Sequence, residues 1–237
     1  MKYVDEFRDP VRAGVLLKEI EALTAQIMAG RDRPVVIMEV CGGHTHSIFR
    51  YGIEKMLPPE IEFAHGPGCP VCVLPMGRVD DCVELAMKPE VIFTTFGDAM
   101  RVPGSRLSLL GAKAEGADVR MVYSPLDALA LARANPDREV VFFGLGFETT
   151  MPSTALTILQ AQAEGIGNFS LFCNHITIIP TIKAILDSPD MGIDGFLGPG
   201  HVSMVIGTDP YDFIARDYHR PLVVAGFEPL DELHSVW

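Results

Sequence analysis

The sequence is poor in basic residues. Lysine and arginine number 19 against 31 aspartate and glutamate residues, which gives a formal net charge of −12 at pH 7. A nucleic-acid-binding protein carries a basic patch, and a protein that binds an anionic membrane surface carries a cluster of Lys and Arg. The sequence has neither feature, so we expect no nucleic acid and no membrane among the partners.

Long apolar runs and a leader segment are also missing. Runs such as 140–143 and 222–225 are far shorter than the roughly 20 residues that cross a bilayer. Residues 1–10 are polar and charged and contain no apolar signal region. We therefore expect a cytoplasmic protein.

Cysteine is too scarce for a disulfide framework. The chain has 5 cysteines in 237 residues, and a chain of this length buries a core of useful size without covalent staples. In a reducing compartment such thiols serve more often as metal ligands or redox groups than as structural bridges. Their positions therefore mark the segments where chemistry is expected.

Short runs rich in β-branched residues alternate along the chain with apolar patterns of helical spacing. This alternation predicts βαβ units, and hence an α/β fold with mostly parallel sheets flanked by helices. The expected strands are 35–40, 91–96, 118–123, 140–143, 169–173, 195–197 and 222–225. The expected helices include 10–29, 78–87, 125–134, 152–164 and 179–187.

A polar, turn-rich stretch at 134–138 indicates a division of the chain into two lobes. We expect an N-terminal lobe over residues 1–125 and a second lobe over residues 126–237. Ligands of open α/β sheets bind at the carboxyl ends of the strands, and the unusual residues of this chain directly follow its strand candidates. The site is therefore expected in a cleft between the lobes.

The first candidate cluster is Cys41–His46 (CGGHTH), which directly follows a strand. Its glycines allow a ligand to approach the backbone closely and allow positive φ. A helix that begins near His44 favours an anion such as the Cys41 thiolate, and a thiolate beside imidazole suits iron, copper or zinc. The alternative is a buried cysteine beside a glycine turn with exposed histidines.

The second cluster is His65–Cys72 (HGPGCPVC). The spacing of Cys69 and Cys72 suits a redox pair or half of a zinc site, and at the start of a following helix the pKa of the Cys69 thiol should fall. A structural zinc site needs four protein ligands. The two missing ligands would come from Cys41, His44, His46 or His65. Two inert thiols are the remaining alternative.

The other two cysteines are predicted to pack in the core. Cys82 lies in an apolar helical stretch and Cys173 ends an apolar strand, and free cysteine behaves as a small hydrophobic residue. His175, close behind Cys173, lines a site or caps the next helix.

Two further motifs follow strands. Gly144–Thr150 (GLGFETT) matches neither dinucleotide-binding nor P-loop patterns, so nucleotide binding is not the leading interpretation. Within it, Glu148 either exchanges protons or holds a ligand, or is an ordinary carboxylate at a helix N-terminus. In Gly198–Ser203 (GPGHVS), His201 sits on a tight turn that either presents its imidazole to a site or is a plain turn.

Together these motifs resemble the HypD family of hydrogenase maturation factors. The resemblance runs along essentially the whole chain, and four separate motifs in family order make it specific. They are Cys41–His46, Gly66–Cys72, Gly146–Thr150 and Pro199–Ser203.

The resemblance implies an assembly scaffold with redox chemistry rather than a conventional enzyme. In this family the protein acts with a HypC-type chaperone, and the iron–dicyanide–carbonyl unit of NiFe-hydrogenase is assembled on it. The cyanides arrive as thiocyanate from a HypE-type donor. Iron, in the form of this unit, is the cofactor that the resemblance implies.

The resemblance also implies roles for single residues. Cys41 matches the iron ligand, shared with the N-terminal cysteine of the HypC-type partner, and His44 matches the histidine placed at the iron. Cys69 and Cys72 match a redox-active dithiol that supplies electrons for releasing cyanide. Glu148 and His201 match residues that face the same cleft, and the residues implied to contact the iron unit are Gly42, Gly43, His46 and Thr149.

The sequence departs from the family pattern in one respect. Family members carry a further C-terminal segment whose cysteines hold a four-iron four-sulfur cluster, whereas this sequence stops at Trp237 without such a cysteine group. No cluster is therefore expected in this chain, which we interpret as a fragment or a short form.

Three other functions remain open. A thiol–disulfide oxidoreductase needs only Cys69 and Cys72. A structural zinc protein needs four ligands and performs no catalysis. A binding module for a partner protein predicts that surface residues, rather than residues of a cleft, are the critical ones.

Overall fold

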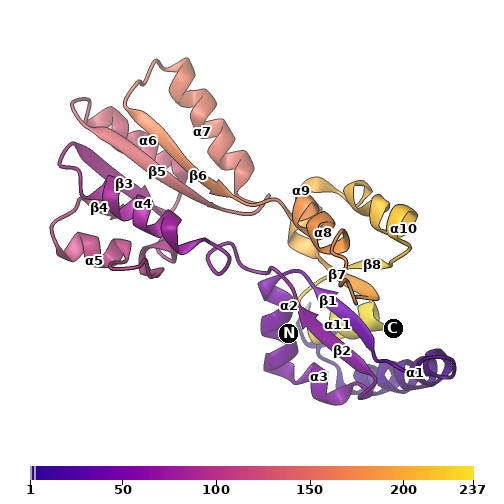
Figure 1. Cartoon of the computed structure of the whole chain (residues 1–237). Coiled ribbons are helices and arrows are strands. Elements are labelled where there is room, and N and C mark those ends of the chain that lie inside the picture. The colour runs from indigo at the N-terminus through magenta and orange to yellow at the C-terminus, as the bar shows by residue number, and fades with distance from the viewer. Residues whose placement is uncertain (1, 3) are drawn as a thin grey trace. The chain divides into compact units, whose positions relative to one another are not determined.

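The computed structural model describes residue 2 and residues 4–237. Their contacts divide the chain into two compact units, each with its own sheet (Figure 1). The first unit combines the residues up to Gly68 with Ile178–Trp237, and the second unit is the continuous stretch Cys69–Thr177. Among the described residues, no helix is both long and apolar enough to cross a membrane.

The first unit is built on a four-stranded parallel sheet in the order β2-β1-β7-β8. Its strands are β1 (Val35–Glu39), β2 (Ile61–His65), β7 (Gly195–Pro199) and β8 (Leu222–Ala225). Its helices are α1 (Pro10–Met28), α2 (Gly42–Tyr51), α3 (Ile53–Met56), α8 (Ile178–Leu186), α9 (Gly200–Ile206), α10 (Asp212–Tyr218) and α11 (Pro229–Val236), with the 3-10 turns η1 (Asp5–Phe7) and η3 (Asp209–Tyr211).

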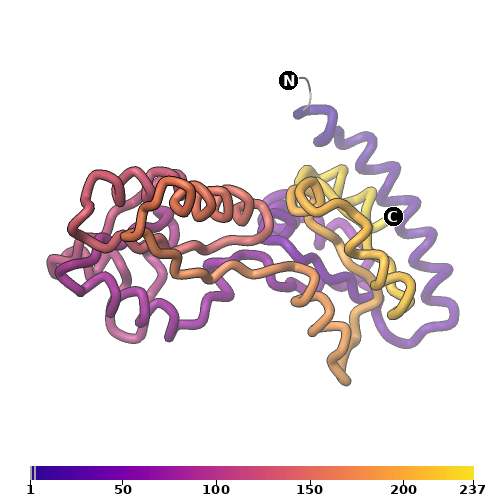
Figure 2. Tube along the Cα trace, turned by 90° about the horizontal axis from the view of Figure 1, so that it is seen from above, coloured from indigo at the N-terminus to yellow at the C-terminus, as the bar shows by residue number. Residues whose placement is uncertain are grey.

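Helix α1 covers part of this sheet together with α11, and the two helices lie side by side (Figure 2). The helix starts because the Asp9 carboxylate accepts the N–H groups of Val11 and Arg12, which is a typical N-cap. Leu16 and Ile20 on its inner face join the buried core of this unit. The core also contains Ile48, Ile53, Leu57, Ile61, Leu230 and Leu233.

The second unit is built on a four-stranded parallel sheet in the order β4-β3-β5-β6. Its strands are β3 (Val91–Thr95), β4 (Val119–Met121), β5 (Glu139–Gly146) and β6 (Phe169–His175). Its helices are α4 (Met76–Ala86), α5 (Leu109–Ala114), α6 (Pro125–Ala134) and α7 (Met151–Ala163), with the 3-10 turn η2 (Ala99–Arg101).

Side chains of the second sheet alternate between two buried clusters. Phe93 and Phe143 belong to one cluster, whereas Ile92 and Phe142, their chain neighbours, belong to the other. Successive residues of a strand point to opposite faces, so both faces of this sheet are covered. Continuous apolar runs are typical of such doubly covered parallel strands, and this explains why the sequence predicts them well.

The two sheets have the same topology. In each, the first strand along the chain pairs with the second on one side and with the third on the other. The strand order therefore reverses between β1 and β7 in the first unit and between β3 and β5 in the second. Crevices at the carboxyl ends of such strand pairs are the preferred ligand sites of open α/β sheets.

The predicted fold class is confirmed as α/β with two parallel sheets flanked by helices. All seven expected strands and the five expected helices are present, with ends shifted by a few residues. The sequence analysis missed β2, whose residues Ile61–His65 mix apolar and polar side chains and closely follow two prolines. It is an edge strand, so it lacks the continuous apolar run of a central one.

The expected division of the chain near residue 125 is wrong. Strands β5 and β6 lie beyond that point, yet β5 pairs with β3 and β6 pairs with β5. The polar stretch at 134–138 is only the connection from α6 to β5. Turn-forming residues mark loops between elements equally well as boundaries between units, and pairing between strands distant in the chain overrides the local signal.

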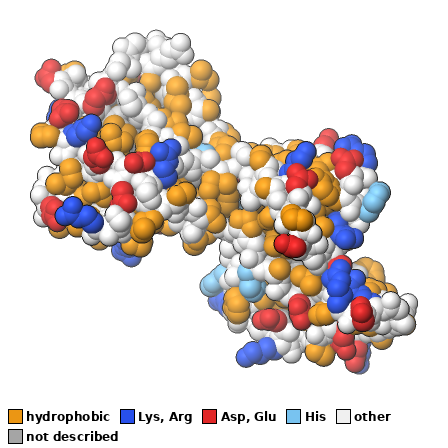
Figure 3. All heavy atoms as spheres, in the orientation of Figure 1, with side chains coloured by type: hydrophobic (Ala, Val, Ile, Leu, Met, Phe, Trp, Pro, Cys, Tyr) orange, Lys and Arg blue, Asp and Glu red, His pale blue; other side chains and the backbone are white. Residues whose placement is uncertain are grey.

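The surface carries both signs of charge. Figure 3 shows acidic and basic side chains interspersed over both units on its visible face. This view agrees with the absence of a basic cluster from the sequence.

Candidate functional site

Cys41 lies where the strand order of the first sheet reverses. It stands two residues after β1, and His201 stands two residues after β7, the neighbouring strand. The Cys41 sulfur is 3.8 Å from Nδ1 of His201. The sheet topology thus brings together a thiol and an imidazole that are 160 residues apart in the sequence.

Cys41 is also the N-cap of α2. Its backbone is extended, with φ −159° and ψ 133°, and its sulfur accepts the N–H of Gly43 at 3.4 Å. The residue is buried. An N–H donor and the N-terminal end of a helix dipole both favour a thiolate over a thiol, so the structure supports the expected helix start next to Cys41.

The Phe227 ring contacts both imidazole rings of the site, those of His44 and His201. Its ring centroid lies 4.9 Å from that of His44 and 5.3 Å from that of His201. A Cβ atom at Gly43 would lie 2.6 Å from the Phe227 ring. Gly43 is thus needed for close packing. Neither Gly42 nor Gly43 has positive φ, so the expected conformational role of these glycines is wrong.

His44 is completely buried beneath this cluster. Its Nε2 lies 3.3 Å from the carbonyl oxygen of Ala225 and donates to it. Burial lowers the pKa of His44, and the nearby charge of His201 lowers it further. The ring is therefore neutral, with Nδ1 as the unprotonated nitrogen that a metal would require. Its role as an iron ligand stays a prediction. His46, two residues on, is exposed.

The loop that precedes Cys69 packs against the residues that follow Cys41. The N–H of Gly42 donates to the Gly68 carbonyl at 2.7 Å. A Cβ atom at Gly68 would lie 2.4 Å from the Gly42 nitrogen. The glycine is required because two backbone segments touch at this position. The first and second sequence motifs therefore meet within the first unit.

Cys69 and Cys72 open the second unit. The N–H groups of Cys72 and Val73 both donate to the Cys69 carbonyl, at 3.0 and 3.2 Å, and this turn brings the two thiols together. Both are free cysteines. The pKa of Cys72 is raised, first by a hydrogen bond with Cys69 and then by burial and the charge of Cys69.

Cys69 does not lie at the start of a helix, so the condition attached to the expectation for its thiol is not met. Helix α4 begins only at Met76, after the N-cap Pro75. Proline and valine between and after the cysteines favour a separate turn, so the helix dipole does not act on Cys69 as the sequence analysis assumed.

Glu148 occupies in the second unit the place that His201 has in the first, two residues after the third strand of the sheet. It is buried, whereas Thr149 is exposed. Thr150 closes the turn by donating its N–H and its hydroxyl to the Phe147 carbonyl, both at 3.1 Å. A Cβ atom at Gly146 would lie 2.0 Å from the Thr150 hydroxyl oxygen, so this turn requires glycine.

The remaining cysteines differ from each other. Cys82 is completely buried, and burial raises its pKa to about 12, which confirms the predicted core role. Cys173 is exposed, with its sulfur 3.5 Å from Nδ1 of His175, so its predicted core role is wrong. Cys173 lies on β6, which is an edge strand of its sheet.

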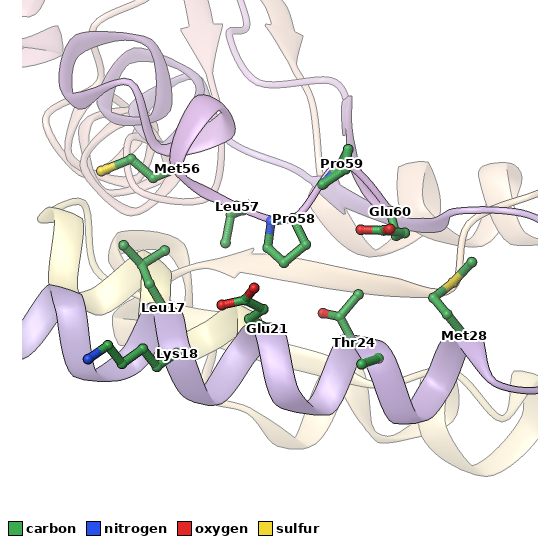
Figure 4. A pocket seen from close by; sticks show the side chains of 11 residues that line it. Leu17, Lys18, Glu21, Thr24, Met28, Met56, Leu57, Pro58, Pro59 and Glu60 are labelled. Carbon is green, nitrogen blue, oxygen red and sulfur yellow. The ribbon is translucent and has the colours of Figure 1, made fainter.

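The described residues contain no group of three or more His, Cys, Asp or Glu side chains arranged to hold a metal ion. Cys41 and His201 form a pair of such side chains. A separate cavity of about 520 Å³ lies between α1 and the segment Met56–Glu60 (Figure 4). None of the predicted site residues lines it.

Sequence reasoning missed Glu39 as part of the site. Glu39 is the last residue of β1, and its buried side chain accepts the Cys41 N–H at 3.1 Å. A glutamate within the apolar run 35–40 was the available signal, because a strand buried on both faces rarely carries a charge.

The fold and the site define the class of protein, which is an α/β protein with two kinds of thiol site. One thiol faces an imidazole where the strand order of the first sheet reverses, and a pair of thiols lies on a turn. The family model HypD, described as "Hydrogenase formation hypA family", matches residues 13–237. The chain belongs to this family.

Curated relatives agree with the family model. The chain is 71% identical over 236 residues to "Hydrogenase maturation factor HypD" of Rhodobacter capsulatus and 64% identical over 236 residues to the protein of the same name from Escherichia coli K12. It is 56% identical over 243 residues to the Rhizobium leguminosarum protein of that name. These alignments cover 100% of this chain but 62–63% of each relative, so the chain spans less than two thirds of their length.

Proposed function

We propose that this chain acts in the maturation of NiFe-hydrogenase, as a scaffold on which the iron–dicyanide–carbonyl unit is assembled. The partners in this proposal are a HypC-type chaperone and a HypE-type cyanide donor, and the compartment is the cytoplasm. Membership of the HypD family and the names of the relatives support the pathway. Iron is the cargo of the scaffold and is passed on to the hydrogenase.

The observation that carries the proposal is the pairing of Cys41 with His201 at 3.8 Å. A thiolate is a soft ligand that suits low-spin iron. The Gly43 N–H and the start of α2 favour the thiolate form. In the proposal Cys41 binds the iron, and cyanide, carbonyl and the partner's cysteine occupy further positions on it.

The neighbouring residues have supporting roles in this proposal. His44 is the second candidate ligand, through Nδ1, and His201 donates to the anionic cargo. Polar groups around a metal orient its ligands and tune it. In the proposal the exposed residues His46 and Thr149 contact the cargo or the partners. Gly42, Gly43 and Glu148 are the remaining residues of the proposed site.

Cys69 and Cys72 serve in the proposal as the reductant for cyanide release. A donor thiocyanate, R–S–CN, gains two electrons and two protons and yields R–SH and HCN, while the two thiols lose the same electrons and protons and form one disulfide. The first step needs a thiolate that attacks sulfur. The raised pKa of Cys72 keeps a proton on that residue, and this favours Cys69 as the attacking member of the pair.

Infrared spectroscopy tests the proposal. The protein is produced together with its HypC-type partner, and the purified complex is expected to show cyanide and carbonyl bands. Cys41→Ala should abolish these bands, whereas the matched variant Cys173→Ala, at an exposed thiol, should retain them. Identical spectra from Cys41→Ala and the unaltered protein, with or without bands, contradict the proposal.

A thiol–disulfide oxidoreductase is the second candidate, favoured by the turn that brings Cys69 and Cys72 together. It predicts that dithiol activity survives Cys41→Ser and that no iron is bound. The structural zinc alternative finds no support among the described residues, because four ligands are needed and no group of three is present there.

A further inference from the structure

Glu39 is a carboxylate that the first unit buries completely, at 0% exposure, at the end of β1. Removing a charged group from water is costly unless hydrogen bonds compensate it. A glutamate at this position therefore needs a specific set of partners. Those partners belong to two of the sequence motifs.

The side chain of Glu39 contacts three other residues. Its Oε2 accepts the backbone N–H of Cys41 at 3.1 Å. Its Oε1 accepts the hydroxyl of Thr45, in the first turn of α2, and lies 2.9 Å from Nδ1 of His65. One carboxylate thus joins the end of β1, the start of α2 and the end of β2.

The backbone of Glu39 strengthens this connection. Its carbonyl accepts the N–H of Gly66 at 2.8 Å, and a Cβ atom at Gly66 would lie 2.7 Å from the same oxygen. Glu39 and His65 are also register partners in the β1–β2 pair. The segment that leads to Cys69 therefore leaves β2 from a point fixed by Glu39.

A second buried carboxyl interacts electrostatically with Glu39. Glu232 in α11 is completely buried, and its pKa is raised to about 8 by burial and by the negative charges of Glu39 and Asp231. At neutral pH it therefore keeps its proton. Glu39 accepts the Cys41 N–H and the Thr45 hydroxyl.

We propose that Glu39 is the positioning residue of the Cys41 site. Its carboxylate holds the Cys41 amide and the Thr45 hydroxyl so that the Cys41 sulfur is directed at His201. The same carboxylate holds His65 with a proton on Nδ1 and leaves Nε2 as the acceptor nitrogen. The importance of this arrangement for iron assembly rests on the proposed function, but its geometry exists without iron.

The first test measures how accessible the Cys41 thiol is. In Glu39→Gln, an amide N–H₂ replaces one of the accepting oxygens, so a contact to Cys41 or to Thr45 and His65 is lost. Loss of a hydrogen bond to a charged group, worth about 1.5–3 kcal/mol, should raise the rate of Cys41 alkylation by iodoacetamide roughly tenfold or more. Exposed Cys173, read by mass spectrometry in the same sample, is the internal reference, and Glu62→Gln on β2 is the matched control that should change nothing.

The second test reads the hydrogen bonds directly by nitrogen-15 NMR. The neutral His65 ring should be the Nδ1–H tautomer in the unaltered protein and should lose this preference in Glu39→Gln, and the Cys41 amide proton should move upfield. A folded Glu39→Gln protein with unchanged Cys41 alkylation and unchanged His65 tautomer overturns the proposal. If that variant does not fold, an Nε2–H tautomer in the unaltered protein overturns it alone.

These readouts separate this inference from the proposed function. Loss of the infrared bands in Glu39→Gln with an undisturbed Cys41 overturns the positioning role and leaves the scaffold function standing. Conversely, infrared bands that survive Cys41→Ala overturn the scaffold function, whereas the alkylation rate and the His65 tautomer still decide the role of Glu39.

Discussion

One buried carboxyl group in the first unit, that of Glu232, responds to pH in a way that can be measured. Glu232 has a pKa of about 8 in the folded protein against an ordinary value of 4.5. The folded chain therefore keeps a proton that the unfolded chain releases above that ordinary value. The free energy of unfolding should fall as pH rises between these two values and then level off.

The variant Glu232→Gln should remove this dependence. Glutamine has the shape of the protonated glutamate and no proton to lose. At pH 5 its stability should lie within about 1 kcal/mol of that of the unaltered protein, and at pH 8 it should be more stable by on the order of a few kcal/mol. Urea unfolding at both pH values measures this. Glu84→Gln, at an exposed glutamate of α4, is the control, and equal pH profiles for all three proteins would show that Glu232 is not buried with its proton.

Gly68 is the residue whose size matters most to the contact between the two cysteine motifs. A methyl group there would meet the Gly42 nitrogen at 2.4 Å and the Cys41 carbonyl carbon at 2.8 Å. Both are backbone atoms, so the segments must separate. Gly68→Ala should therefore destabilise the protein by about 1–3 kcal/mol and expose the Cys41 thiol to alkylation.

Gly14→Ala is the comparison for that variant. Gly14 lies inside α1, and nothing lies within 4 Å of an added Cβ atom. Alanine should stabilise the helix by about 0.5–1 kcal/mol. Thermal unfolding that gave both alanine variants the same sign of change would refute the close approach at Gly68.

Among the elements, α6 depends on a capping box. The Ser124 hydroxyl accepts the N–H of Leu126 at 3.2 Å, and the Asp127 carboxylate accepts the N–H of Ser124 at 3.0 Å. Ser124→Ala should cost about 1 kcal/mol. Ser153→Ala in α7, whose hydroxyl only donates to the Thr150 carbonyl, should change stability much less. Equal losses in chemical denaturation would mean that the cap contributes nothing.

The sequence predicts an element well where its local signals, such as the apolar pattern and the helix cap, point to the same element. The central strands are apolar because both sheet faces are covered, and α1 and α6 carry N-caps, so pattern and capping agree with the fold. Strand β2 was not predicted because it lies at an edge of its sheet. Helix α2 was expected only conditionally because its glycines and histidines are poor helix formers. Tertiary packing against Phe227 and the β8 end determines that helix.

Site residues divide along the same line. The positions of Cys41 and His201 follow from strand ends, which a sequence pattern reveals. The pairing of these two residues does not, because it depends on which strands are neighbours. The contacts of Glu39 and the burial of Glu232 depend on how helices α2 and α11 pack on the sheet, and no local pattern encodes that packing.

The whole molecule consists of an inserted unit within a discontinuous one. Residues 69–177 have their own sheet and two buried clusters. Produced alone, this stretch should fold cooperatively, with a single urea transition and dispersed NMR signals. Residues 1–125, the lobe suggested by the turn signal, should not, because they lack β5 and β6. Folding of the second fragment but not of the first would contradict the division.

The discontinuous first unit has a consequence for protein synthesis. Its sheet lacks β7 and β8 until residues 195–225 leave the ribosome, and the imidazole that meets Cys41 is made 160 residues after the thiol. At about 5–20 residues per second, that delay lasts on the order of ten seconds or more. During this interval the inserted unit is able to fold, whereas the nascent thiol waits without its partner imidazole.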